Sequence, residues 1–515
     1  MEMPSYLMHA AACFAALVFL LKGFYLRRHK LNPPPGPKAW PIVGNLHQID
    51  SLLPHHSIHH LSQKYGPLMQ LKYGSRRVVV ASSIEMARAF LKTHDASFSG
   101  RPKTAAGKYT TYNYSDIMWS QCDAYWRQAR KMCTVELFSA SRVQSFEYIR
   151  IEERRSLSKT LYKSKGMASN LRNHLADVSL NLISKIVLGR KYVGAEENDS
   201  KNGASFVTPN EFKEMIEELF LLNGVMNIGD YIPWLNFLDL QGYVKRMKAL
   251  APKFDRFLEH VLDEHVTKKE AAGNDFVAKD MVDVLLQFAD NPSNEVKFTR
   301  TSVKAFTQDL LAGGTESSAM MVEWAISELL RTPEILKKAT EELDRVIGRE
   351  RWVKEEDIKN LPYIEAIIKE TMRMHPVAPL LSPRMTSEHV NINGYDIPSG
   401  SHAYISVWAI GRDPTLWEEP ERFNPERFIG ETIGIKGQDF RLLPFGVGRR
   451  MCPGYSLGIK LIYSSLTNLL HGFNWKLPNG VKAHDLNMEE IWGLTVPRKI
   501  PLIVVSEPRL PDHLY

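Results

Sequence analysis

The sequence predicts one large, mainly helical domain with small β-sheets, behind a single N-terminal transmembrane helix. Three observations support this fold class. The chain has 515 residues, of which 44% are hydrophobic and 24% charged, which is ordinary for a globular protein with a large core. Helical periodicity dominates after residue 40, where no internal repeat or low-complexity tract occurs. An apolar run long enough to cross a bilayer lies near the N-terminus.

The composition excludes several classes of protein. It is too apolar for a disordered chain, and a mean hydropathy of −0.25 argues against a multi-pass membrane protein. The net charge of +7 is spread without a Lys/Arg tract, so we expect no nucleic-acid binding, whereas an anionic membrane surface or an acidic partner suits it. The 4 cysteines are widely spaced and form no CxxC motif, which indicates a reducing compartment and no common zinc or redox motif.

The apolar run at residues 5–26 predicts the membrane anchor. A helix of that length spans about 33 Å, enough for a hydrocarbon core of roughly 30 Å. The basic residues 27–30 follow this run, whereas a cleaved signal peptide carries its charge before the apolar part. The positive-inside rule then places the body of the protein in the cytoplasm. We therefore divide the chain into an anchor (1–30), a stiff proline-rich hinge (31–40) and a globular body (41–515).

Prolines and glycines mark the elements of the body. A Gly-Ser turn at 74–75 predicts a hairpin of strands 68–72 and 77–81. Further along the chain we expect a long helix over 301–331, a helix from Pro333 to near Gly348, a helix from Pro362 that cannot run far past Pro376, and a polar connection over 268–280.

A glycine-rich loop with a lone cysteine carries the strongest chemical signal. Residues 445–454 read FGVGRRMCPG, and a helical run over 456–470 follows. The glycines let the backbone approach something flat or bulky. Backbone amides and the N-terminal end of the next helix stabilise a thiolate at Cys452, and Arg450 adds positive charge for an anion. The alternative is a buried cysteine in a turn.

This loop resembles the heme-binding signature of the cytochromes P450, Phe-x-x-Gly-x-Arg-x-Cys-x-Gly. All its fixed positions are filled, by Phe445, Gly448, Arg450, Cys452 and Gly454. Three further motifs occur in the family's order. The anchor with a proline hinge and the Cys-Pro-Gly form resemble the plant microsomal A-type branch. The resemblance implies the cytochrome P450 fold, with residues 41–515 as the catalytic domain.

The resemblance also assigns the cofactor and its contacts. It implies heme b (iron protoporphyrin IX), with Cys452 as the axial ligand of the iron, and a thiolate ligand favours O–O cleavage. In the family, the Trp-x-x-x-Arg pair, here Trp126 and Arg130 on one helix face, reaches a heme propionate. Arg450 is expected to be another propionate contact, and Arg384 is a weaker candidate.

A second motif, Glu370-Thr371-Met372-Arg373, implies a structural triad. Glu and Arg three positions apart share one helix face, but surface pairs of this kind are common. In the family the pair is buried and is joined by an arginine of a Pro-Glu-Arg-Phe segment. This chain has two such segments, and we assign the triad to Arg427 rather than to Arg422, because the family places Trp417 and Phe423 upstream of that arginine.

Two adjacent glycines destabilise the long helix, so their presence needs a structural or functional explanation. Gly313 and Gly314 each cost about 1 kcal/mol relative to Ala in a helix, and close helix packing is the alternative explanation. The resemblance implies an oxygen-binding groove here, with Glu316 and Ser317 as catalytic residues that relay protons. The family usually has Thr at the second position. Ser317 keeps the hydroxyl and loses the methyl that restricts χ1, so we hypothesise a relay held less rigidly; Thr315 is off-register.

Two other groups of side chains allow more than one interpretation. His55, His56, His59 and His60 form HHxxHH, which can bind zinc, but no nearby acid completes HExxH, and a polar stretch of a surface helix is favoured. Exposed basic residues could form a solvated surface, whereas the resemblance favours a docking face for an acidic NADPH–cytochrome P450 reductase. These basic residues are Arg127, Lys131 and Arg449.

Together these features predict a heme-thiolate monooxygenase on the endoplasmic reticulum membrane, with its body in the cytosol. It would use O2 and NADPH-derived electrons, through the reductase, to hydroxylate a lipophilic plant specialised metabolite: a flavonoid or other phenolic, a terpenoid, a steroid or an alkaloid. The resemblance implies that substrate contacts come from residues 104–123, 211–232, 306–312, 377–381 and 491–496. The pocket candidates in or near these regions are Phe220, Leu221, Leu222, Met226, Phe306, Leu310, Val377, Leu380, Leu381 and Leu494. The alternatives are oxidative coupling, rearrangement or C–C cleavage without net hydroxylation, and, more distantly, a non-catalytic membrane-anchored heme protein.

Overall fold

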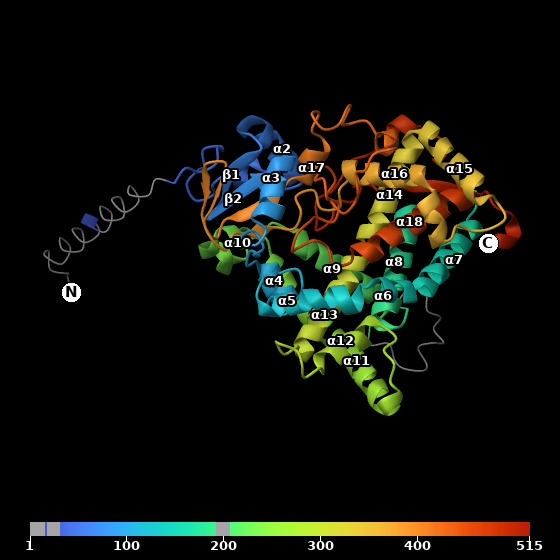
Figure 1. Cartoon of the computed structure of the whole chain (residues 1–515), viewed down its shortest axis with the longest axis horizontal. Coiled ribbons are helices and arrows are strands. Elements are labelled where there is room, and N and C mark those ends of the chain that lie inside the picture. The colour runs from blue at the N-terminus through green and yellow to red at the C-terminus, as the bar shows by residue number, and fades with distance from the viewer. Residues whose placement is uncertain (1–15, 18–30, 192–206) are drawn as a thin grey trace.

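The structure, a computed structural model, describes residues 16–17, 31–191 and 207–515. Helices form most of this part of the chain, and small sheets lie mainly near its two ends (Figure 1). The predicted anchor at residues 5–26 lies outside the described residues apart from positions 16–17. Within the described ranges, no helix combines the length and the apolar character needed to span a membrane.

The predicted hairpin is confirmed and belongs to a four-stranded sheet. Strands β1 (Leu68–Tyr73) and β2 (Arg76–Ala81) pair antiparallel. β2 also pairs in parallel with β7 (His402–Ile405), with Val78 opposite His402, and β7 pairs with β4 (Arg384–Met385), so the strand order is β1-β2-β7-β4. Two smaller sheets are formed by β3 (Ala168–Asn170), β9 (Ile503–Pro508) and β8 (Phe473–Lys476), and by β5 (Val390–Ile392) and β6 (Tyr395–Ile397).

The helices divide into three groups along the chain. The first group is α2 (Pro54–Tyr65), α3 (Ile84–Arg88), α4 (Ala105–Thr110), α5 (Ala124–Met132), α6 (Ala140–Ser145), α7 (Glu147–Lys163) and α8 (Leu171–Leu188). The second is α9 (Pro209–Gly224), α10 (Ile228–Tyr231), α11 (Tyr243–Ala272), α12 (Met281–Ala289), α13 (Arg300–Thr315) and α14 (Ser317–Arg331). The third is α15 (Pro333–Ile347), α16 (Pro362–Met374), α17 (Val407–Gly411) and α18 (Tyr455–Gly472).

The helix boundaries set by proline and glycine are confirmed. α15 and α16 both carry proline in their first turn, where its missing N–H costs no hydrogen bond. α15 ends before Gly348, which has a φ of 75°, and α16 ends before Pro376. The polar connection expected over 268–280 is partly helical instead, because α11 continues to Ala272.

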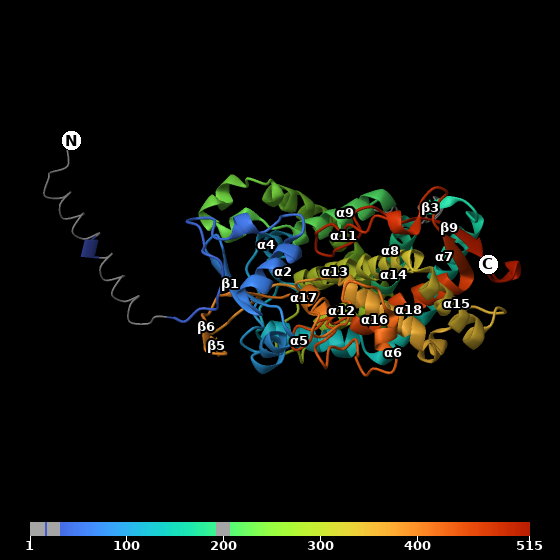
Figure 2. The same ribbon diagram turned by 90° about the horizontal axis from the view of Figure 1, so that it is seen from above.

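The long helix expected over 301–331 is not continuous. It divides at Glu316 into α13 and α14, which follow one another through the middle of the body (Figure 2). Two side chains bond back to the helix here: Thr315 Oγ1 donates to the Leu311 carbonyl at 2.5 Å, and Ser317 Oγ donates to the Gly313 carbonyl at 3.2 Å. Such back-bonding bends helices, and the two preceding glycines weaken this one further.

The divided helix joins the two largest apolar cores. One core packs α13 against α5, α8, α11 and α12, and includes Leu457 and Leu461 from the start of α18. The other packs α14 against α15, α16 and the rest of α18. α14 is buried from Ser318 to Leu330, as expected for a helix surrounded by others. The cysteine loop and the broken helix therefore converge on one part of the interior.

Candidate functional site

At two positions of the cysteine loop, the backbone conformation favours glycine. Gly446 and Gly448 have φ values of 65° and 81°, in the left-handed region. A Cβ on Gly448 would also come within 2.5 Å of the Leu91 carbonyl oxygen. The Cys452 amide donates to the Phe445 carbonyl at 2.9 Å, which closes the loop. α18 then begins at Tyr455, so the cysteine lies at the N-terminal end of an 18-residue helix.

The Cys452 sulfur lies in a site that suits a metal-bound thiolate. Burial raises the pKa of the thiol, while a hydrogen bond from the Gly454 amide and the charge of Arg130 lower it. A bound metal cation deprotonates a coordinating thiol. The Gly454 amide and Arg130 would then stabilise the Cys452 thiolate that a heme iron would form. The role of axial ligand stays a prediction, and the surroundings of the sulfur are consistent with it.

Three guanidinium groups gather beside this loop: Arg101 and Arg384 are buried, and Arg450 is half-buried. Arg450 donates to the carbonyls of Ser99 (2.9 Å) and Ile117 (3.2 Å), and lies 4.3 Å from the centre of the Trp126 ring. Burial lowers the pKa of Arg450 to about 10, and it also lowers the pKa of Arg384. Burial, followed by the charges of Arg450 and Arg384, lowers the pKa of Arg101 well below its ordinary value.

This arginine cluster is short of negative charge. Among the described residues, the only ion pair to any of the three comes from Asp95, whose Oδ1 lies 3.1 Å from Arg384 Nη1. A group carrying two carboxylates, as heme does, would supply the missing charge, so the donor set fits that cofactor. Arg101 was missed by sequence reasoning, because it carries no motif and only the fold brings it beside Arg384 and Arg450.

The Trp126 and Arg130 side chains differ in their present partners. Both lie on α5, and Trp126 Nε1 donates to the Ile117 carbonyl at 3.2 Å. The Arg130 guanidinium has no hydrogen bond or ion pair with any residue in the described part of the chain, and the groups whose charge acts on it are Cys133 and Cys452. Arg130 is therefore available for an anion, whereas Trp126 is occupied by backbone; both assignments stay predictions.

The two glycines of α13 face different surroundings. A Cβ on Gly313 would meet nothing within 4 Å, which leaves room beside the helix. A Cβ on Gly314 would lie 2.3 Å from the Ile183 side chain of α8, so close packing explains this glycine. The oxygen-binding groove remains a prediction for both positions, and the space it requires is present at Gly313.

Glu316 is held at the break between α13 and α14. Burial raises its pKa, while a hydrogen bond with the Thr495 side chain and the charge of Arg172 lower it. Glu316 lines a cavity of about 320 Å³ between α8, α9 and residues 491–497, whose walls also carry Lys213 and Glu217. A half-buried acid beside a cavity with charged walls suits a group that passes protons inward.

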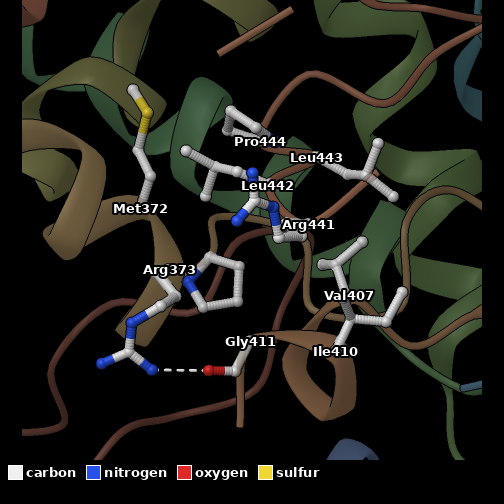
Figure 3. Close-up of a pocket in the computed structure, with 10 residues that line it drawn as sticks. Met372, Arg373, Val407, Ile410, Gly411, Arg441, Leu442, Leu443 and Pro444 are labelled. Atoms are coloured by element: carbon white, nitrogen blue, oxygen red, sulfur yellow. Dashed lines mark hydrogen bonds between the residues drawn. The ribbon is translucent and has the colours of Figure 1, made fainter. Parts of the chain in front are cut away.

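The Glu370–Arg373–Arg427 triad is confirmed. Arg373 forms two hydrogen bonds to the Glu370 carboxylate, at 2.7 and 2.8 Å, and Arg427 Nε lies 3.1 Å from Glu370 Oε1. Arg373 also points at the Gly411 carbonyl (Figure 3). The cavity shown there is only about 10 Å³, room for a single water at most. Arg422, in the other Pro-Glu-Arg-Phe segment, is exposed and pairs with Glu419.

The prediction of a surface helix for the histidines is wrong for His55. Its side chain is fully buried in α2, and its Nε2 lies 2.7 Å from Glu490 Oε1. His56 Nε2 lies 2.6 Å from the same oxygen and is half-exposed. No sequence signal could have linked α2 to Glu490, because 435 positions separate His55 from it.

The expected pocket residues are divided between two cavities and the core. Phe220, Leu221 and Leu494 line the 320 Å³ cavity. A second cavity of about 110 Å³ is lined by Met226, Leu380, Leu381 and again Leu494. Met118, Trp119 and Trp492 also line it, and they lie within the expected regions 104–123 and 491–496. Leu222 and Phe306 are buried in the core, which Leu310 packs against, and Val377 packs against the α14 core.

The expected basic face is present on α5. Arg127 and Lys131 are exposed. Arg449 is exposed as well, but its backbone amide and side chain both interact with Asp95. A docking role for this face stays a prediction.

Comparison with known proteins gives a consistent result. The family model of cytochrome P450 matches residues 34–504. A trimethyltridecatetraene synthase from Zea mays is 47% identical over 95% of this chain and 91% of its own, and a flavonoid 3'-monooxygenase from Petunia hybrida is 42% identical over the full length of both. A zebrafish cytochrome P450 solved with progesterone superposes with a TM-score of 0.75 at 26% identity, over 88% of this chain and 99% of that one. With its cysteine signature, its triad and its fold, this chain belongs to the cytochrome P450 family of monooxygenases.

Proposed function

We propose that this P450 oxidises a lipophilic plant specialised metabolite, and that an acyclic terpenoid suits its cavity better than a flavonoid. The observation that carries the proposal is the 110 Å³ cavity, whose lining is largely apolar and aromatic. Two of its polar side chains, Asn223 and Asp230, are engaged with the protein itself, whereas the buried Asn227 Nδ2 has no hydrogen-bond partner among the described residues. Asn223 accepts from Trp119 Nε1 at 3.2 Å and donates to Thr110 Oγ1 at 3.2 Å, and Asp230 accepts from the Ala105 amide at 2.8 Å.

Because these groups are already bonded, few remain for the several hydroxyls of a flavonoid. A polyhydroxylated ligand would bury polar groups without partners, which costs binding free energy, whereas an aliphatic chain with one oxygen would not. The relatives agree with this preference. Besides the trimethyltridecatetraene synthase, a dimethylnonatriene synthase from Zea mays is 45% identical over 98% of this chain.

The residues of the chain divide the work of the reaction. Heme with a thiolate ligand, when bound, supplies the activation of dioxygen with electrons from NADPH. Cys452 would provide that ligand, and Arg101, Arg384 and Arg450 would hold the propionates. Glu316 and Ser317 would carry protons from the 320 Å³ cavity toward the reacting centre.

A second outcome, C–C cleavage, is favoured by the names of the relatives. Trimethyltridecatetraene and dimethylnonatriene are hydrocarbons of sixteen and eleven carbons, one more than a multiple of the five-carbon isoprene unit. Oxidative removal of a carbon fragment from a longer terpenoid gives such a product. Hydroxylation and cleavage differ only in the fate of the same oxidised substrate.

We also propose the cellular setting. The apolar run at 5–26 and the basic residues after it support anchoring in the endoplasmic reticulum membrane with the body in the cytosol. The exposed basic residues of α5 support electron delivery by NADPH–cytochrome P450 reductase, whose acidic surface they would attract.

Spectral titration followed by turnover tests the proposed function. The purified ferric protein is titrated with farnesol, an acyclic terpenoid alcohol, and with naringenin, a flavonoid, while the Soret band is recorded. We expect a saturable low-spin to high-spin shift with farnesol, and, with reductase and NADPH, a product that has gained oxygen or lost carbon. A saturable shift with naringenin alone would contradict the substrate class. A reduced-CO spectrum without the thiolate-type Soret band would support the non-catalytic alternative.

A further inference from the structure

A short hairpin-like loop borders both cavities of the site. The Ile491 amide donates to the Pro497 carbonyl at 3.0 Å, and Glu490 and Arg498 form an antiparallel bridge at its base. We call residues 491–497 the cavity loop. Trp492, Gly493 and Leu494 of this loop line both the 110 Å³ and the 320 Å³ cavity. A small change in its position would therefore alter both spaces.

The base of the cavity loop is fixed to α2 by His55, His56 and Glu490, which we call the histidine clamp. Both ring Nε2 atoms lie within 2.7 Å of the single oxygen Glu490 Oε1. The His55 side chain is fully buried, and the Glu490 side chain is 14% exposed. The His55 ring also stacks on Trp492, with ring centres 5.5 Å apart and planes 24° apart. The clamp thus contacts the loop both at its base and at a residue that lines the cavities.

At neutral pH the hydrogen bonds of the clamp are made to an ionised carboxylate, that of Glu490. Burial of Glu490 by itself favours the protonated acid, but the hydrogen bonds from His55 and His56 overcome it and hold the pKa of Glu490 well below its ordinary value. Burial lowers the pKa of His55, so its ring is a neutral donor to an ionised carboxylate. Hydrogen bonds to a charged group are among the stronger ones in proteins.

The far side of the cavity loop contacts the end of α9 and the acid of the broken helix. Trp492 Nε1 donates to the Gly224 carbonyl at 3.1 Å. A Cβ on Gly224 would lie 2.1 Å from the Leu494 amide nitrogen, so the loop packs directly on the α9 backbone. Thr495 and Glu316 both line the 320 Å³ cavity, and Thr495 lies close enough to Glu316 to lower its pKa. The loop therefore connects the clamp on α2 to the substrate cavity and to the predicted proton relay.

We propose that the histidine clamp is a positioning device that sets the place of Trp492 and Thr495, and so controls both how a ligand sits in the cavity and how efficiently protons reach the reacting centre. His55 and Glu490 are positioning residues, since they act through the loop. The proposal rests on the P450 chemistry of the proposed function, but on no particular substrate.

Binding of 4-phenylimidazole to the heme-loaded protein gives a test without knowledge of the substrate. Its imidazole nitrogen ligates heme iron and its phenyl group occupies the space above, so the Soret shift reports the shape of the cavity. In His55→Ala we expect the dissociation constant to rise on the order of tenfold, the effect of losing one such hydrogen bond. We also expect more hydrogen peroxide per NADPH consumed with reductase. Both changes should be largely reversed in His55→Gln, whose amide keeps a donor.

Controls separate positioning from general instability. His60→Ala alters an exposed histidine of the same helix and should behave as wild type in both measurements. Every variant must first show the wild-type reduced-CO spectrum. If His55→Ala fails to load heme, Glu490→Gln takes its place, because the amide keeps the shape and removes the charge. The clamp proposal would be overturned by variants that show a normal CO spectrum, an unchanged affinity for 4-phenylimidazole and an unchanged yield of hydrogen peroxide per NADPH. A wild-type protein without the thiolate-type spectrum would overturn the proposed function instead.

Discussion

Among single residues, the buried Asp116 and the half-buried Asp309 make the stability of this protein depend on pH. Asp116 Oδ1 accepts from the Trp119 amide at 3.0 Å within the loop before α5. Asp309 Oδ2 accepts from the Ile117 amide at 2.8 Å and so links this loop to α13. Burial raises the pKa of Asp116 to about 7, although the Trp119 amide opposes it. Burial, followed by the charge of Asp116, raises the pKa of Asp309 further.

Raised carboxyl pKa values in the folded state mean that the protonated pair stabilises the fold and that this contribution is lost as pH rises. The loss begins above the unfolded value near 4 and, for Asp116, is complete above about 7. We expect Asp116→Asn to gain free energy of unfolding relative to wild type as pH increases from 5 to 7.5. Urea unfolding across that range measures it, and a constant difference between the two proteins would contradict the titration of this pair.

Ser317 gives a second prediction for a single side chain. Its hydroxyl donates to the Gly313 carbonyl at 3.2 Å, and the relay requires that this hydroxyl can also turn toward the site. We expect Ser317→Ala to consume several-fold more NADPH per oxygenated product, because the proton carrier is lost. Ser317→Thr serves as the control and should couple at least as well as wild type, since the added methyl restricts χ1. Unchanged coupling in the alanine variant would remove Ser317 from the relay.

The duplicated Pro-Glu-Arg-Phe segment offers a matched pair of variants at the scale of elements. The first copy, residues 420–423, contains the exposed Arg422. The second copy forms the 3₁₀ helix Pro425–Phe428, in which Arg427 pairs with Glu370 of α16. Arg427→Ala leaves the buried Glu370 carboxylate with less compensation and should lower the free energy of unfolding by about 3–5 kcal/mol.

Arg422→Ala removes the same side chain from an exposed pair and should change the free energy of unfolding by no more than about 0.5 kcal/mol. Thermal unfolding of the two heme-loaded variants in parallel compares them directly. Equal losses of stability would mean that the buried triad contributes no more to the free energy of unfolding than the exposed pair does.

The elements that local chemistry controls could be predicted, and those that depend on distant partners could not. α15 and α16 follow from Pro333, Gly348 and Pro362, whose backbone preferences act over a few residues. The break at Glu316 escaped prediction, because helix periodicity continues through it and only side-chain back-bonding reveals the competition. The burial of His55 escaped it for the other reason, since Glu490 is remote in sequence.

For the molecule as a whole, site residues at fixed sequence spacing could be predicted, whereas site residues that only the fold brings together could not. The cysteine signature and the triad were readable because their residues stand at fixed spacing. Arg101 was not, because its place in the arginine cluster arises from three separate segments of the chain. Charge balance in the folded protein, and not any local pattern, supports the proposal that Arg101 belongs to the cofactor site.

The overall charge distribution leads to the last prediction. If the reductase docks on the basic face of α5, Lys131→Glu should raise the reductase concentration needed for half-maximal activity several-fold at low salt, and the difference should shrink at high salt. Lys337→Glu on α15, far from α5 in Figure 1, is the matched control and should have little effect. Steady-state turnover against reductase concentration measures both, and equal effects would refute a localised docking face.

The parallel pairing of β2 with β7 has a consequence for biosynthesis. Val78 cannot meet His402 until more than three hundred further residues have been made. At about 5–20 residues per second, the ribosome needs roughly 15–60 seconds to supply them. During that interval the valine-rich edge of β2 has no permanent neighbour and is a site for unwanted strand pairing between nascent chains. Production of this protein should therefore benefit from a low concentration of nascent chains and from abundant chaperones, which protect that edge until its partner strand emerges.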